Sequence, residues 1–205
     1  MMDALNIRRP AVFLDRDGVI NEIIYNEDTE QMDSPFCTEQ FDLIAGVKEA
    51  VNNLKGLGFY IFVVTNQPAA AKGKTTVRKI EEVNNYMCQL LDNMIDKVYT
   101  CYHFPKSTKY TKKKDLIQEC NCRKPAPGLL LQAMKDYDVD REKSYMVGDS
   151  WTDVVAGFAA GVRTAFVGSY KCDVCKRLER KPDIIVPDLL SFSIRLREYM
   201  EEIHK

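Results

Sequence analysis

The 205-residue sequence has no hydrophobic run approaching the length of a membrane span, and residues 1–10 lack the apolar core of a secretory signal. It has no excess of one charge, because 29 lysines and arginines balance 30 aspartates and glutamates. This balance argues against nucleic acid or a membrane surface as a partner. Internal repeats, linkers and low-complexity blocks are also missing, and the odd number of cysteines, seven, argues against a complete disulfide framework. We therefore expect one monomeric, cytoplasmic domain over residues 1–205, whose cysteines are metal ligands or buried thiols.

Apolar runs alternate along the chain with segments of helical periodicity. The runs predict strands at residues 11–15, 59–65, 97–102, 144–147, 163–167 and 183–186. Helices are predicted at residues 46–57, 76–94, 151–160 and 188–203, with another beginning at residue 127. This alternation favours an α/β fold built on a doubly wound parallel sheet. Two polar stretches do not fit it: residues 22–41, which indicate a loop or small flap, and the lysine-rich residues 103–119.

Two carboxylates, Asp15 and Asp17, follow the first predicted strand and lead into a glycine turn. At the carboxyl end of a strand in an open α/β sheet, both can reach one ligand. The spacing suits metal-assisted phosphoryl transfer, in which Asp15 attacks phosphorus and ligates Mg²⁺ while Asp17 protonates the leaving group and then activates water. The alternative is an ordinary strand-end turn with two solvated acids.

Two other segments suit phosphate binding. Thr65 and Asn66 follow the second strand, where a hydroxyl and an amide can hydrogen-bond phosphoryl oxygens, although Thr-Asn is also ordinary turn chemistry. Arg123 and Lys124 precede a predicted helix start, and backbone N–H groups beside fixed positive charge attract phosphate. The alternative for this second pair is surface charge before a proline turn.

Asp149 ends the fourth strand, and Asp153 follows one helical turn later on the same face. With Asp15 they form an oxygen-rich set that suits Mg²⁺. The alternative is capping of the helix by Asp149 or Ser150.

Four metal-ligating side chains bracket the lysine-rich segment and end directly before Arg123. They are Cys101, His103, Cys120 and Cys122. Three thiolates and one imidazole form a closed tetrahedral zinc set, so we expect a structural zinc that orders a loop over residues 101–122. Cys172 and Cys175 have half of a zinc-ribbon spacing, and the sequence leaves their role open.

The order Asp-x-Asp-Gly, Thr-Asn, Lys and Gly-Asp-x-x-x-Asp resembles the haloacid dehalogenase (HAD)-like phosphatases over roughly residues 11–168. The resemblance implies a Rossmann-like core and an aspartyl-phosphate intermediate, with Asp15 as nucleophile and Asp17 as general acid/base. It also implies that Thr65 and Lys124 hold the phosphoryl group. Mg²⁺ would bind Asp15, Asp149 and the backbone carbonyl of Asp17, with Asp153 just behind these ligands.

The cysteine-bound loop is similar to that of the histidinol-phosphate and heptose-1,7-bisphosphate phosphatase branch of this superfamily. Residues 15–21 and 122–128 look closest to the heptose enzymes, which implies a phosphorylated sugar substrate dephosphorylated at the 7-position. The alternatives are histidinol phosphate, another small sugar phosphate, or a catalytically idle domain whose zinc loop serves a partner. No gap is long enough for a large cap domain, so substrate selection is expected from Asn21, residues 22–41, Lys72 and the metal loop. The stretch 68–73 departs from the family's usual sequence, which leaves the exact substrate and anomer open.

Overall fold

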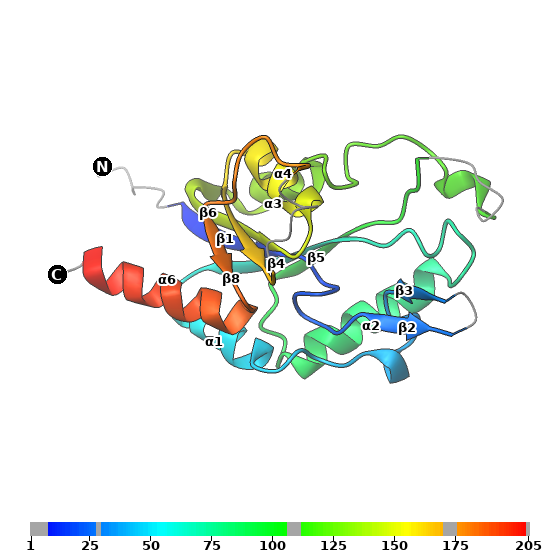
Figure 1. The fold of residues 1–205 in the computed structure, drawn as a ribbon, viewed down its shortest axis with the longest axis horizontal. Coiled ribbons are helices and arrows are strands. Elements are labelled where there is room, and N and C mark those ends of the chain that lie inside the picture. The colour runs from blue at the N-terminus through cyan, green and yellow to red at the C-terminus, as the bar shows by residue number, and fades with distance from the viewer. Residues whose placement is uncertain (1–7, 28–29, 106–111, 170–175, 204–205) are drawn as a thin grey trace, which may run out of the picture.

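The computed structural model describes residues 8–27, 30–105, 112–169 and 176–203 (Figure 1). Cys172 and Cys175 therefore lie outside the described residues. Six parallel strands form one sheet in the order β5-β4-β1-β6-β7-β8. The strands are β1 (Arg9–Leu14), β4 (Tyr60–Asn66), β5 (Lys97–Cys101), β6 (Val139–Gly148), β7 (Arg163–Val167) and β8 (Ile184–Val186). This topology confirms the predicted α/β fold.

Helices cover both faces of the sheet. They are α1 (Val47–Gly56), α2 (Val77–Leu90), α3 (Gly128–Tyr137), α4 (Trp151–Ala160) and α6 (Leu189–Ile203). In Figure 1, α3 and α4 lie above the sheet, and α1, α2 and α6 lie below it. Residues of β1 alternate between two hydrophobic clusters: Val12 and Leu14 pack on the α1, α2 and α6 side, and Ala11 and Phe13 on the α3 and α4 side. Burial on both faces explains why this strand is a continuous apolar run.

The polar stretch 22–41 contains a two-stranded antiparallel hairpin, β2 (Ile24–Asn26) and β3 (Gln31–Asp33), followed by the 3-10 helix η1 (Thr38–Gln40). A second 3-10 helix, η2 (Lys114–Leu116), lies in the lysine-rich segment. Both segments lie at the right of Figure 1, beyond the carboxyl end of β1. The described residues between Asp17 and α1 form no separate cap domain.

Two predicted boundaries were wrong by more than two residues. Helix α2 ends at Leu90 rather than at residue 94, because Asp92 and Asn93 take positive φ angles of 51° and 56°. Strand β6 begins at Val139 rather than at residue 144, and its pairing with β1 shifts register between Pro10 and Val12. No helix in the described part of the chain has both the length and the apolar character needed to cross a membrane.

Candidate active site

The candidate site lies at the carboxyl edge of the sheet, where β1 runs between β4 and β6. Asp15 follows β1 directly, and its backbone N–H donates to the carbonyl of Val147 on β6 at 3.0 Å. Asp149 follows β6, and Thr65 lies near the end of β4. Parallel strands bring their carboxyl ends to one edge, so segments far apart in sequence meet here.

Lys124 is buried between two carboxylates. Its Nζ lies 2.8 Å from Asp15 Oδ1 and 2.6 Å from Asp153 Oδ1, and the Lys124 and Asp153 side chains are each 1% exposed. Asp15, Asp149 and Asp153 each offer a carboxylate oxygen, and these oxygens lie within 4.8 Å of one another. The structure thus brings together four residues singled out from three separate sequence segments.

The carboxylates carry more negative charge than Lys124 balances. Burial, together with Asp153 and Asp149, raises the pKa of Asp15 to about 8, although Lys124 opposes the rise. Burial and the Asp153 carboxylate likewise raise the pKa of Asp149 to about 6. A cation added among these oxygens would favour their ionised forms.

Two glycines allow the acidic groups to approach the backbone. A Cβ at Gly18, whose φ is +84°, would lie 2.2 Å from Asp149 Oδ2. A Cβ at Gly148 would lie 2.2 Å from the Cβ of Asp153. Asp153 also takes part in the capping box of α4, since its Oδ2 accepts the N–H of Ser150 at 3.0 Å. The predicted capping alternative therefore holds for Ser150, which is the N-cap residue, but not for Asp149; Asp153 completes the capping box.

Asp17 accepts hydrogen bonds from four side chains. Oδ1 accepts from Arg16 and from Asn21 Nδ2, each at 3.0 Å. Oδ2 accepts from Gln67 Nε2 at 2.6 Å and from Ser34 Oγ at 2.9 Å. Burial favours the neutral carboxyl, but the Arg16 charge and the hydrogen bonds outweigh it and hold the pKa of Asp17 below its usual range. The sequence predicts that Asn21 helps to select the substrate. The structure shows that Asn21 is fully buried and donates to Asp17 instead.

The predicted phosphate-binding side chains have partners within the protein. The buried Thr65 hydroxyl accepts from Gln67 Nε2 at 2.9 Å. Asn66 holds the backbone of Lys124: its Oδ1 accepts the Lys124 N–H at 3.0 Å, and its Nδ2 donates to the Lys124 carbonyl at 3.1 Å. Asn66 therefore fixes the segment that carries the central cation, and phosphoryl contact by Thr65 and Asn66 remains a prediction.

Arg123 lies over the ring of Phe104, with its Cζ 5.5 Å from the ring centroid. The Nζ of Lys72 lies over the same ring at 4.9 Å. Burial and the nearby cations Lys74 and Arg123 lower the pKa of Lys72. The two cations thus share one aromatic platform beside the carboxyl edge.

The four predicted zinc ligands also converge. Cys122 Sγ lies 2.9 Å from Cys101 Sγ, 3.3 Å from Cys120 Sγ and 3.2 Å from His103 Nδ1. Donors placed ~2.3 Å from a tetrahedral zinc lie roughly 3.8 Å apart. The distances from Cys101 Sγ to Cys120 Sγ and to His103 Nδ1, 3.7 and 3.8 Å, match this spacing, and the three distances from Cys122 are shorter. Gln118 Nε2 lies 2.7 Å from His103 Nε2, which orients the imidazole so that Nδ1 faces the thiols. This cluster could hold a metal ion.

Comparison with known proteins agrees with this arrangement. A family model described as "HAD-hyrolase-like" matches residues 121–192. The D-glycero-beta-D-manno-heptose-1,7-bisphosphate 7-phosphatase of Haemophilus ducreyi is 33% identical over 186 residues, which cover 89% of this chain and 95% of that protein. The Escherichia coli K12 protein of the same name is 39% identical over 160 residues, 76% of each chain. The chain belongs to the HAD-like phosphatases.

Solved structures agree on the HAD fold. A D,D-heptose 1,7-bisphosphate phosphatase from B. bronchiseptica, complexed with magnesium and phosphate, superposes with a TM-score of 0.75 at 24% identity and covers 93% of this chain and 99% of its own. A putative HAD-like phosphatase from Mesorhizobium loti gives a TM-score of 0.74 at 25% identity, covering 94% and 88%. The predicted family resemblance is thereby confirmed.

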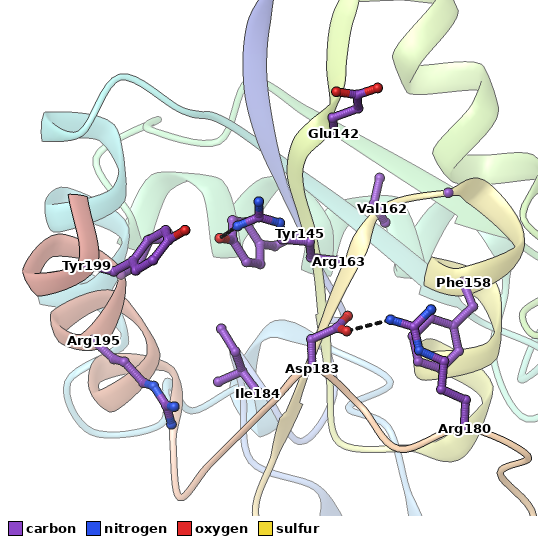
Figure 2. A pocket seen from close by; sticks show the side chains of 12 residues that line it. Glu142, Tyr145, Phe158, Val162, Arg163, Arg180, Asp183, Ile184, Arg195 and Tyr199 are labelled. Atoms are coloured by element: carbon purple, nitrogen blue, oxygen red, sulfur yellow. Dashed lines mark hydrogen bonds and ion pairs between the residues drawn. The ribbon is translucent and has the colours of Figure 1, made fainter. Parts of the chain in front are cut away.

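A separate cavity of about 620 Å³ lies at the opposite edge of this HAD-like sheet (Figure 2). Arg163 and Ile184, the first residues of β7 and β8, line it with Tyr145 and Tyr199. None of the predicted site residues lines this cavity.

Sequence analysis missed three residues around Asp17: Arg16, Ser34 and Gln67. Arg16 is fully buried, and its Nη1 donates to Asn84 Oδ1 at 2.8 Å. The arginine between Asp15 and Asp17, and the glutamine directly after Thr65-Asn66, are sequence signals that could have been used. Nothing in the local sequence indicates Ser34, because its contact depends on the path of the hairpin.

Proposed function

We propose that this HAD-like phosphatase is Mg²⁺-dependent and hydrolyses D-glycero-D-manno-heptose 1,7-bisphosphate at the 7-position. The observation that carries the chemistry is the cluster of Asp15, Lys124, Asp149 and Asp153, of which Lys124 and Asp153 are buried. The substrate is supported by relatives that bear this name and are 33–39% identical over 76–89% of the chain.

The residues at the carboxyl edge fit Mg²⁺. Asp15, Asp149 and Asp153 offer hard oxygen donors, which Mg²⁺ prefers, and their excess negative charge is only partly balanced by Lys124. Asp15, Asp149 and the backbone carbonyl of Asp17 would hold the ion, and Asp153 would fix Lys124 beside them. When bound, the ion would offset the charge of the phosphoryl oxygens.

In the first step, a carboxylate oxygen of Asp15 attacks phosphorus, and an acyl-phosphate bond forms. The bond from phosphorus to the sugar oxygen breaks, and Asp17 gives a proton to that oxygen. Because the pKa of Asp17 is lowered in the free protein, Asp17 must take up this proton when the substrate binds. In the second step, the Asp17 carboxylate takes a proton from water, the oxygen of that water attacks phosphorus, and the bond to Asp15 breaks. Lys124 neutralises the phosphoryl group in both steps, and Arg123 binds another part of the substrate.

The proposed role of Zn²⁺ is structural. Its ligands Cys101, His103, Cys120 and Cys122 leave no open position, and the last of them precedes Arg123 directly. Zinc would thus fix the segment that carries Arg123 and Lys124.

The test is phosphate release with Mg²⁺ from both anomers of the heptose bisphosphate, beside histidinol phosphate and fructose 1,6-bisphosphate. We expect preference for one heptose anomer, and no turnover by Asp15→Asn, which removes the nucleophile. Preference for histidinol phosphate would replace the substrate assignment with the same chemistry retained. Full turnover by Asp15→Asn would exclude Asp15 as the nucleophile. Absence of phosphate release from all four substrates by folded, metal-loaded protein would exclude the proposed function.

A further inference from the structure

The acid/base carboxyl Asp17 is contacted by the segment that follows the β2–β3 hairpin. Ser34 comes directly after β3, and its Oγ donates to Asp17 Oδ2 at 2.9 Å. Gln67 reaches the same oxygen from the loop after β4, at 2.6 Å. Arg16 and Asn21 hold Oδ1, so donors on both oxygens fix the plane of the carboxyl group.

Ser34 is itself held in place by a clamp between two loops. Its neighbour Asp33 forms an ion pair with Lys74, with Nζ 2.6 Å from Oδ2 and 2.8 Å from Oδ1. The Asp33 and Lys74 side chains are only 14% and 20% exposed, so solvent screens this pair less than a surface pair. Thr75 adds a hydrogen bond from its hydroxyl to the carbonyl of Phe36 at 3.3 Å. The clamp thus ties the base of the hairpin to the segment before α2.

We propose that Ser34 is a positioning residue for proton transfer by Asp17, and that the Asp33–Lys74 ion pair holds it in register. The inference rests on the proposed function only in that Asp17 is the group that protonates the leaving oxygen. A carboxyl that must deliver a proton to one oxygen atom needs a fixed orientation. Arg16, Asn21 and Gln67 belong to the sheet edge and its turns, whereas Ser34 belongs to the hairpin. The hairpin therefore contributes to catalysis through Asp17, in addition to any contact with substrate.

The test compares leaving groups. Departure of an alkoxide from a sugar phosphate needs a proton from Asp17, whereas p-nitrophenolate leaves without one. General acid catalysis typically contributes ~10²- to 10⁴-fold, so loss of orientation in Ser34→Ala should lower kcat/KM for the sugar phosphate by at least about tenfold. The value for p-nitrophenyl phosphate should stay within about twofold, since its leaving group gains nothing from the acid. Ser34→Thr, which keeps a hydroxyl, should restore the sugar-phosphate value.

A second variant keeps the proposal testable if Ser34→Ala folds poorly. Lys74→Met removes the clamp without touching Ser34 or Asp17 and should show the same selective loss. Lys48→Met is the matched control, because the Lys48–Asp92 pair lies on the surface with side chains 53% and 62% exposed. Circular dichroism and urea midpoints check folding of all variants.

Equal losses on both substrates would overturn the proposal, because a structural or binding role does not depend on the leaving group. No loss on either substrate would overturn it as well. A fall confined to KM would assign Ser34 to substrate binding instead. Any alkyl phosphate that the wild type hydrolyses serves here, so failure of the heptose assignment would leave this comparison intact.

Discussion

Replacing Lys124 with methionine removes the cation that Asp15 and Asp153 share. Burial alone would lower the pKa of Lys124, but the two carboxylates outweigh burial and raise it to about 12 from 10.5. One pKa unit corresponds to about 1.4 kcal/mol, so the site favours the charged lysine by roughly 2 kcal/mol relative to water. The substitution also leaves two buried carboxylates without their partner, and breaking a buried ion pair in this way typically costs about 3–5 kcal/mol.

We therefore expect the free energy of unfolding of metal-free Lys124→Met to fall by about 3–5 kcal/mol. In a chain of this size the melting temperature should fall by roughly 6–20 °C. Urea unfolding in EDTA, followed by circular dichroism, measures the loss. Because the unpaired carboxylates attract cations, Mg²⁺ should raise the midpoint of the variant more than that of the wild type.

Two controls separate this effect from a general loss of packing. Adding Asp153→Asn to Lys124→Met removes one unpaired charge and should restore part of the stability. Lys48→Met removes an exposed ion pair and should cost no more than about 1 kcal/mol. A Lys124→Met protein as stable as the wild type in EDTA would refute the argument that this lysine compensates buried charge.

Further predictions concern the same edge of the sheet. In metal-free protein the pKa of Asp149 is raised to about 6 from 3.8, so the folded chain retains a proton that the unfolded chain has lost. The free energy of unfolding should thus fall as pH rises through 4 to 6, and Asp149→Asn should flatten this part of a urea series; an unchanged slope would contradict the prediction. Cys122→Ser should lower zinc content by mass spectrometry together with kcat/KM, and retention of both would argue against the zinc loop. Gly18→Ala should raise the Mg²⁺ concentration for half-maximal activity at least about tenfold, because its Cβ would displace a ligand. Gly58→Ala is the control, since Gly58 has a similar φ of +89° but no atom within 4 Å of its Cβ.

The layered fold could be predicted because its strands are buried on both faces and its helices are amphipathic. Strands β4, β5 and β7 differ from the predicted ranges by at most one residue at each end. The first half of β6 could not be found in this way, because residues 140–143 are polar and lie near the sheet's amino edge. Its pairing depends on Ser144, whose Oγ accepts the N–H of Ala11 at 2.9 Å across the register shift. That contact joins residues 133 positions apart and leaves no local pattern.

The candidate site, like the fold, could be predicted only in part from the sequence. Asp15, Lys124, Asp149 and Asp153 could be grouped from sequence, because each follows a strand or precedes a helix at one edge of a parallel sheet. Their catalytic roles remain predictions, although the distances among them suit those roles. The surroundings of Asp17 could be predicted only in part, because loops rather than strand order bring Ser34 and Gln67 to it.

The two oxygens of Asp17 share Arg16 as a donor but differ in their other partners. Oδ1 is held by Arg16 and Asn21, which belong to the turn after β1 and are fully buried. Oδ2 accepts from Gln67 and from Ser34, whose position depends on a hairpin clamped through an ion pair, and at 3.3 Å also from Arg16. The clamp through Asp33 and Lys74 therefore acts on Asp17 through Ser34, whereas Asp15 and Lys124 are joined by an ion pair of their own.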